Sequence, residues 1–149
     1  MSTVTEVHTT QVYQVFIKAS PEQIWEAITK PEFTAQYFYG QAIEVAGGRR
    51  TWRNANGEVV TDEPVIEAEP PRRLVHSWSS AYDPEMAAEP ESRVTWEIEG
   101  QEDGSALLTV VHDGLENSPK TAASVSGPGW MLVLSGLKTL LETGKPLAG

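Results

Sequence analysis

The sequence predicts an α+β fold in which one long helix near the C-terminus packs on an antiparallel sheet. Large apolar residues near the end of the chain recur at the spacing of a single helix face. These residues are Trp130, Leu134, Leu137 and Leu141. Between residues 41 and 113 apolar and polar residues mostly alternate, which is typical of antiparallel strands covered on one face. One apolar helix laid on such a sheet can enclose a pocket.

The first third of the chain predicts one strand followed by two short helices. Residues 9–18 are rich in β-branched and aromatic side chains and predict the strand. Ser20 and Gln23 have the spacing of a capping box, which predicts that a helix begins directly after Ser20. Pro31 ends this helix, because the residue before a proline avoids the helical conformation. Residues 31–39 predict the second short helix.

Six further strands follow, and the last helix closes the chain. The expected strands are residues 41–45, 49–54, 58–69, 72–80, 92–99 and 106–113. Pro64 interrupts the third of them, which indicates a sheet edge or a bulge. With residues 9–18 they predict a sheet of six to seven strands. We expect the run of Gly127, Pro128 and Gly129 to break or restart the last helix, and Gly144 to end it.

The composition excludes several classes of protein. The chain has 149 residues and a net charge of -10, which disfavours a nucleic-acid partner. It has no cysteine, so disulfides, thiolate nucleophiles and cysteine zinc sites are excluded. No signal peptide is visible, and no apolar run approaches the roughly 20 residues that span a bilayer. We therefore expect one cytoplasmic domain over residues 1–149, a monomer or homodimer, with no cofactor and no metal.

Three segments of the chain carry a resemblance to a known family. They are residues 19–25 (ASPEQIW), residues 69–78 (EPPRRLVHSW), and Gly129-Trp130 with the leucines of the last helix. They occur in the same order as in the family and span nearly the whole chain. The sequence resembles the bacterial branch of the family named for activators of the Hsp90 ATPase, which belongs to the START-like, or SRPBCC, superfamily.

The resemblance implies the helix-grip fold of START and Bet v 1-like proteins. In that fold a curved antiparallel sheet grips the C-terminal helix, and an elongated apolar cavity usually lies between them. The superfamily includes lipid carriers, hormone receptors, polyketide cyclases, oxygenase domains and co-chaperone domains, so it implies no single reaction. The family name adds chaperone partners and stress response as expectations.

Ten residues are expected to line this cavity. They lie on the inward faces of the expected strands and helices: Trp25, Phe38, Trp52, His76, Trp78, Trp96, Val110, His112, Trp130 and Leu134. Trp25 and Phe38 would close one end from the two short helices. Mostly apolar walls with a few polar groups are typical of small-molecule sites. The alternative is that the same aromatic residues fill the core, which is the commoner role of a tryptophan.

His76 and His112 are the two polar residues in this inward set. A histidine there can hold a ligand carboxylate or hydroxyl, or transfer a proton near neutral pH. The alternative, which we favour, is a neutral histidine hydrogen-bonded to the backbone or to water. Neither of the usual histidine metal motifs, HxH and HExxH, occurs in the sequence.

A cluster of arginines is conspicuous in this acidic chain. It comprises Arg49, Arg50, Arg53, Arg72 and Arg73. Such a cluster can receive an acidic partner or a ligand carboxylate. The alternative, which we favour, is surface charge that balances glutamates on neighbouring strands.

Three functions remain open from the sequence. The first, which the aromatic inward face favours, is binding of an apolar small molecule, lipid-like or aromatic. The second is a cyclase or aromatase that uses His76 or His112 as general base and Tyr37 as acid. The third is a module that binds a chaperone or regulator through its charged surface.

Overall fold

The computed structural model of the chain describes residues 10–80 and 83–147. The strands are β1 (Gln11–Ile17), β2 (Ala42–Ala46), β3 (Arg49–Arg53), β4 (Val59–Pro64), β5 (Glu67–Glu69), β6 (Arg73–Trp78), β7 (Ser92–Gly100) and β8 (Ala106–Asp113). The helices are α1 (Pro21–Thr29), α2 (Pro31–Tyr37), α3 (Pro84–Ala87), α4 (Pro119–Ser124) and α5 (Trp130–Thr143), with a π-helical turn η1 (Val125–Gly129) between the last two.

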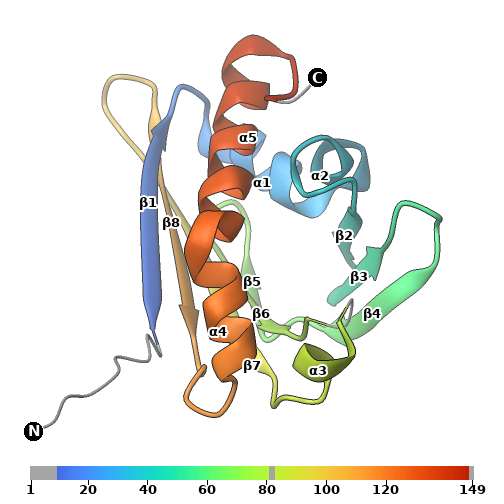
Figure 1. Cartoon of the computed structure of the whole chain (residues 1–149). Coiled ribbons are helices and arrows are strands. Elements are labelled where there is room, and N and C mark those ends of the chain that lie inside the picture. Colours follow the sequence, from blue (N-terminus) through green and yellow to red (C-terminus); the bar gives the residue numbers. More distant parts are fainter. Residues whose placement is uncertain (1–9, 81–82, 148–149) are drawn as a thin grey trace, which may run out of the picture.

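The strands form a curved antiparallel sheet in two hydrogen-bonded parts. Their orders are β1-β8-β7-β6-β5 and β2-β3-β4. The chain crosses between the parts at two adjacent residues: the Val65 N–H donates to the Gly48 carbonyl and the Ile66 N–H to the Val75 carbonyl, both at 2.9 Å. The expected strand 58–69 is therefore divided into β4 and β5. In Figure 1, β1 and β8 lie on one side of the long helix and β2–β4 on the other, which confirms the α+β helix-grip fold.

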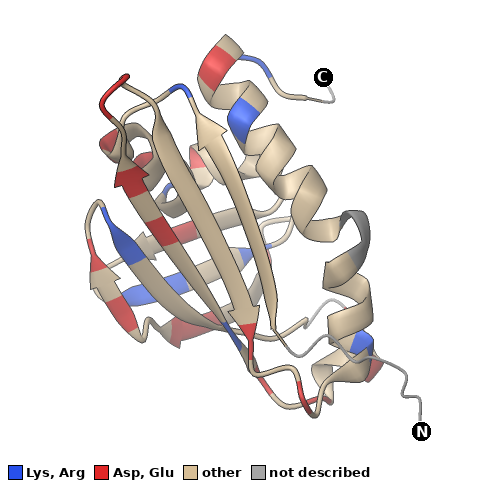
Figure 2. Cartoon of the chain, turned by 90° about the vertical axis from the view of Figure 1, so that its left-hand side faces the viewer, with Lys and Arg blue, Asp and Glu red and all other residues tan. Residues whose placement is uncertain are grey.

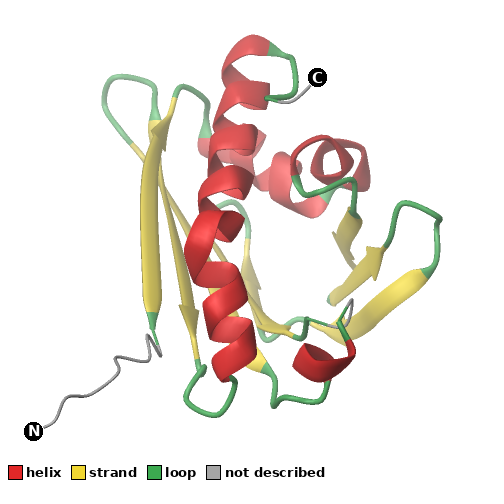
Figure 3. Cartoon of the chain, viewed as in Figure 1, coloured by secondary structure: helices red, strands yellow, loops and turns green. Residues whose placement is uncertain are grey.

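The two short helices begin and end as their sequence predicts. The Gln23 N–H donates to Ser20 Oγ at 3.2 Å, and Gln23 Oε1 accepts from the Ser20 N–H at 2.9 Å, which confirms the capping box. Helix α2 follows directly at Pro31. Tyr37 Oη donates to the Ala27 carbonyl at 2.7 Å and ties the two helices together. They lie side by side against α5 (Figure 3).

The expected interruption of the last helix at residues 127–129 takes the form of a π-helical turn: the helical segment continues from α4 through η1, and the regular α-helix restarts at Trp130, as predicted. Pro128 has no N–H to donate, and the backbone widens into η1 instead of leaving the helix. The Trp130 N–H donates to the carbonyl of Val125, five residues earlier. Gly144 ends α5 in the left-handed conformation, with φ 78°, as predicted.

One glycine sets how closely α5 approaches the short helices. A Cβ atom on Gly136 would lie 3.1 Å from Cβ of Tyr37, which is tighter than ordinary side-chain contact. The absence of a side chain therefore lets α5 pack on α2 with nearly direct backbone contact.

The molecular surface is acidic, but its charges are dispersed. Figure 2 shows acidic and basic residues interspersed over the strands and hairpin turns, and a long C-terminal helix that carries few charges. Within residues 10–80 and 83–147, we find no helix with the length and apolar character to cross a membrane.

Candidate ligand-binding cavity

A cavity of about 550 Å³ lies between the sheet and the helical segment. Its wall comes from the end of α2 and the residues after it, from β3 and β6, and from the helical segment around η1. The lining residues are Phe38, Tyr39, Gln41, Trp52, Trp78, Ser124, Val125, Gly129, Trp130, Leu132 and Val133. Its volume lies in the range that holds a drug-sized ligand, about 300–1,000 Å³.

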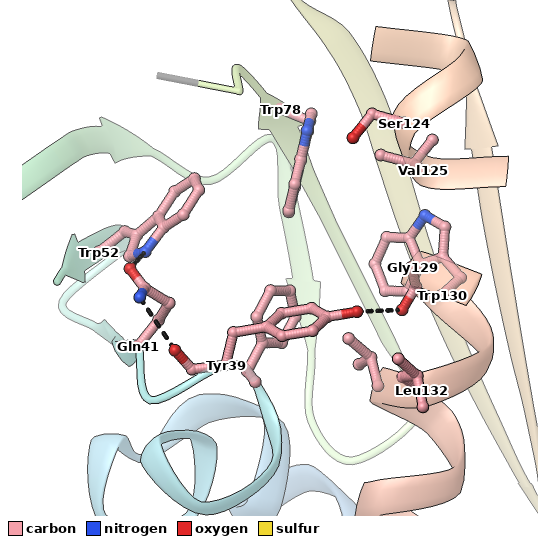
Figure 4. A pocket seen from close by; sticks show the side chains of 11 residues that line it. Tyr39, Gln41, Trp52, Trp78, Ser124, Val125, Gly129, Trp130 and Leu132 are labelled. Atoms are coloured by element: carbon pink, nitrogen blue, oxygen red, sulfur yellow. Dashed lines mark hydrogen bonds between the residues drawn. The ribbon is translucent and has the colours of Figure 1, made fainter. Parts of the chain in front are cut away.

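Three indole rings dominate this wall, and each has its N–H bonded within the protein. Trp52 Nε1 donates to Gln41 Oε1 at 2.7 Å, and Trp78 Nε1 donates to Ser80 Oγ at 3.0 Å. Trp130 Nε1 donates to Nδ1 of His112 at 3.1 Å. Figure 4 shows the three rings around one space. Because the polar edges are satisfied, the rings offer carbon surface to a ligand.

Tyr39 bridges one side of the cavity. The residue is 57 % exposed, and its hydroxyl donates to the Gly129 carbonyl at 3.0 Å. Its own carbonyl accepts from Gln41 Nε2 at 3.1 Å, and both bonds are visible in Figure 4. The φ of Tyr39 is 53°, a left-handed conformation that is uncommon for a residue other than glycine. Tyr39 therefore links the end of α2 to the π-helical turn.

The structure brings four of the ten sequence-predicted site residues to the cavity wall. These are Phe38, Trp52, Trp78 and Trp130. Five others are buried but do not line this cavity: His76, Trp96, Val110, His112 and Leu134. Trp25 is only partly buried and packs against the core from α1. A role of any of the ten in binding stays a prediction.

The hydrogen bonds of His112 define its protonation state. An indole N–H can only donate, so Nδ1 of His112 accepts from Trp130. The proton of the neutral ring is then on Nε2, which donates to Ser92 Oγ at 2.7 Å. Burial lowers the pKa of His112 to about 4, against a smaller opposing effect of Asp113. His112 therefore cannot accept the Ser92 proton, and the pair is not a nucleophilic dyad.

His76 is held by the same kind of pair. Trp96 Nε1 donates to Nε2 of His76 at 2.9 Å, so the ring proton is on Nδ1, which donates to the Ser77 carbonyl at 2.9 Å. Burial, and then the nearby charge of Arg50, hold the pKa of His76 well below its usual value. Both histidines are thus hydrogen-bonded at both ring nitrogens, as in the neutral state that we favoured, but three of the four partners are side chains and not backbone or water.

The arginine cluster divides into a surface part and one buried member. Three arginines are partly or fully exposed and form ion pairs. Arg49 pairs with Asp62, and Arg72 pairs with Glu69. Arg73 pairs with both Glu67 and Glu97. Arg50 is only 6 % exposed. The expectation of surface charge was wrong for Arg50, because its position in β3 shares the inward face with Trp52. No group of histidines and carboxylates that could hold a metal ion occurs in the described ranges.

Sequence reasoning missed part of the wall. The missed residues are Tyr39, Gln41, Ser124, Val125, Gly129, Leu132 and Val133. Most belong to the helical segment around η1, where a π-helical turn rotates the helix faces relative to a regular α-helix. The Gly-Pro-Gly sequence was the available signal, since it marks an irregular turn inside a helix.

Comparison with known proteins agrees with this architecture. The family model described as "Activator of Hsp90 ATPase homolog 1-like protein" matches residues 18–142. No curated protein matches the chain. Protein MLL2253 from Mesorhizobium loti has 25% identity and a TM-score of 0.70, covering 89% of this chain and 96% of that chain.

Two further solved structures are informative. DynU16, a protein from the dynemicin biosynthetic locus, has 26% identity and a TM-score of 0.70 over 93% of this chain and 49% of that chain. Aha1 from Colwellia psychrerythraea, solved as a dimer, has 22% identity and a TM-score of 0.66. The match covers 91% of this chain and 98% of that chain. The family match and the shared fold agree with the resemblance in the sequence: the chain belongs to the Activator of Hsp90 ATPase homolog 1-like family of the START-like superfamily.

Proposed function

We propose that the chain binds a flat apolar or aromatic small molecule in the cavity between the sheet and the helical segment. The observation that carries the proposal is the arrangement of the three indole rings. The ring centroids of Trp52 and Trp78 are 5.5 Å apart, and those of Trp78 and Trp130 are 5.9 Å apart. A planar ligand gains stacking and burial against such rings. The similarity to DynU16, which comes from a biosynthetic locus, also supports a small-molecule ligand.

The geometry gives less support to a cyclase that uses a cavity histidine. Both candidate bases, His76 and His112, are buried away from the cavity and accept indole N–H groups. The proposed acid, Tyr37, is buried and donates to the Ala27 carbonyl. A catalytic role would therefore need other groups of the wall.

Two expectations about setting and partners also remain proposals. We keep the cytoplasmic location as a proposal. A second copy of the chain is a candidate partner, because the similar Aha1 of Colwellia psychrerythraea was solved as a dimer.

Ser124→Trp should weaken ligand binding about tenfold or more, because the added indole occupies the space that a ligand needs. Ser124 lines the cavity and is exposed, so the substitution leaves the core intact. The measurement is a titration with naphthalene-2-methanol, an uncharged two-ring probe, followed by tryptophan quenching and by the shift in melting temperature.

The matched control is Ala123→Trp, one residue earlier on α4 and outside the cavity wall. It should bind the probe like the original chain. The proposal is wrong if the original chain does not bind the probe and other flat apolar compounds, or if Ser124→Trp binds as well as Ala123→Trp.

A further inference from the structure

The side chain of Arg50 is a buried cation that has no hydrogen-bonding partner among the described residues. Its guanidinium carbon lies 5.9 Å from the ring centroid of Trp52 and 5.8 Å from that of Trp78. Within the described residues it makes no hydrogen bond and no ion pair. Glu63, its cross-strand neighbour, accepts a hydrogen bond from Ser77 and acts on Arg50 only at longer range.

An isolated buried charge is unfavourable, and cation–π contacts offset only part of that cost. Burial lowers the pKa of Arg50 to about 10, so the guanidinium stays charged at neutral pH. Among the described residues, no fully enclosed polar side-chain atom lacks a partner. The unpartnered nitrogens of Arg50 therefore keep a small accessible surface.

The position of Arg50 connects it to the proposed binding site. The two rings that it contacts, Trp52 and Trp78, both line the main cavity. Arg50 also borders a second, small cavity of about 10 Å³, and Phe38 borders both spaces. Arg50 itself does not line the main cavity, so its guanidinium lies behind the aromatic wall, in contact with the rings of Trp52 and Trp78.

We infer that the ligand is an aromatic acid, and that its carboxylate is drawn to Arg50 while its rings pack on the tryptophans. The inference rests on the proposed function and specifies its ligand class. A guanidinium matches a carboxylate with two parallel hydrogen bonds, and the pair is stronger in a dry site than in water. A chain with a net charge of -10 repels anions overall, so a preference for an acid requires a local cation.

The test compares two probes that share a ring system, 2-naphthoate and naphthalene-2-methanol. The original chain should bind the acid about tenfold more tightly than the alcohol, the ratio expected for one buried charged contact. Arg50→Met should lose this preference by weakening the acid and leaving the alcohol unchanged. Arg50→Lys, which keeps the charge, should retain a preference for the acid. Arg53→Met, an exposed change on the same strand, is the matched control.

The melting temperature of each variant gives an independent readout. Arg50→Met should melt at the same or a higher temperature, because it removes an unpaired buried charge. Equal affinity of the original chain for the two probes would overturn the inference but leave the proposed function intact. An acid preference that survives in Arg50→Met would also overturn it. If neither probe bound the original chain, the proposed function itself would fail.

Discussion

Trp130→Ala should lower the free energy of unfolding by about 3–5 kcal/mol, the usual cost of removing a large core aromatic. Trp130 is 3 % exposed, and its ring contacts those of Phe38, Trp78 and Trp96. The substitution also leaves Nδ1 of buried His112 without its donor. Equilibrium unfolding in urea at neutral pH measures the effect.

Trp130→Phe distinguishes the stabilisation that comes from the ring contacts from that of the hydrogen bond. It keeps most of the apolar contact and loses only the N–H donated to His112, so its loss should be clearly smaller than that of Trp130→Ala. Trp25→Ala, a change at a partly buried tryptophan, should also cost less. A loss under about 1 kcal/mol for Trp130→Ala would show that the helix does not depend on this contact.

Acidification should lower the free energy of unfolding at pH values well above the pH range in which carboxylates titrate. The pKa of His112 is about 4 in the folded chain and about 6.5 when unfolded, so the unfolded state binds more protons between these values. Stability is therefore full above pH 6.5 and falls as the pH falls toward 4. His112 alone should remove about 2 kcal/mol between pH 7.5 and pH 5. His76, whose pKa is also lowered, adds to the loss.

The free energy of unfolding, measured by urea titration across this pH range, checks the prediction. His112→Gln cannot titrate, so its curve should be flatter than that of the original chain by about 2 kcal/mol, whatever its absolute stability. Arg50, whose charge acts on His76, has a pKa of about 10 and keeps its charge over this range. A stability that is constant from pH 7.5 to pH 5 would contradict the neutral, indole-bonded state of both histidines.

Local signals in the sequence predicted most of the fold. Ser20 and Gln23 cap α1 because their partners are three residues away, and Gly144 ends α5 for an equally local reason. The alternation of β7 and β8 marks the inward face correctly, with Val94, Trp96 and Val110 all buried. Such features depend on neighbours along the chain and can be read without a structure.

The remaining features depend on contacts between distant segments. The sequence contains His76 and His112 but not the indoles that bond them, which come from Trp96, 20 residues along, and Trp130, 18 residues along. Arg50 lies two residues before Trp52 in β3, so the alternation of this strand already indicated an inward position; the sequence alone does not show that the rings of Trp52 and Trp78 surround its guanidinium. The wall around η1 was missed because the expected interruption at residues 127–129 was not recognised as a π-helical turn that joins two helices.

The indole N–H resonances of the chain report directly on whether a ligand binds in the cavity between the sheet and the helical segment. The chain has five tryptophans, of which Trp52, Trp78 and Trp130 line the cavity, while Trp25 and Trp96 do not. Isotope-labelled protein is titrated with naphthalene-2-methanol and followed by NMR, with each indole assigned by its Trp→Phe variant. The resonances of the three cavity indoles should shift together at one affinity, and those of Trp25 and Trp96 should move least. A spectrum that does not change, or one in which Trp25 responds first, would contradict a ligand site between the sheet and the helix.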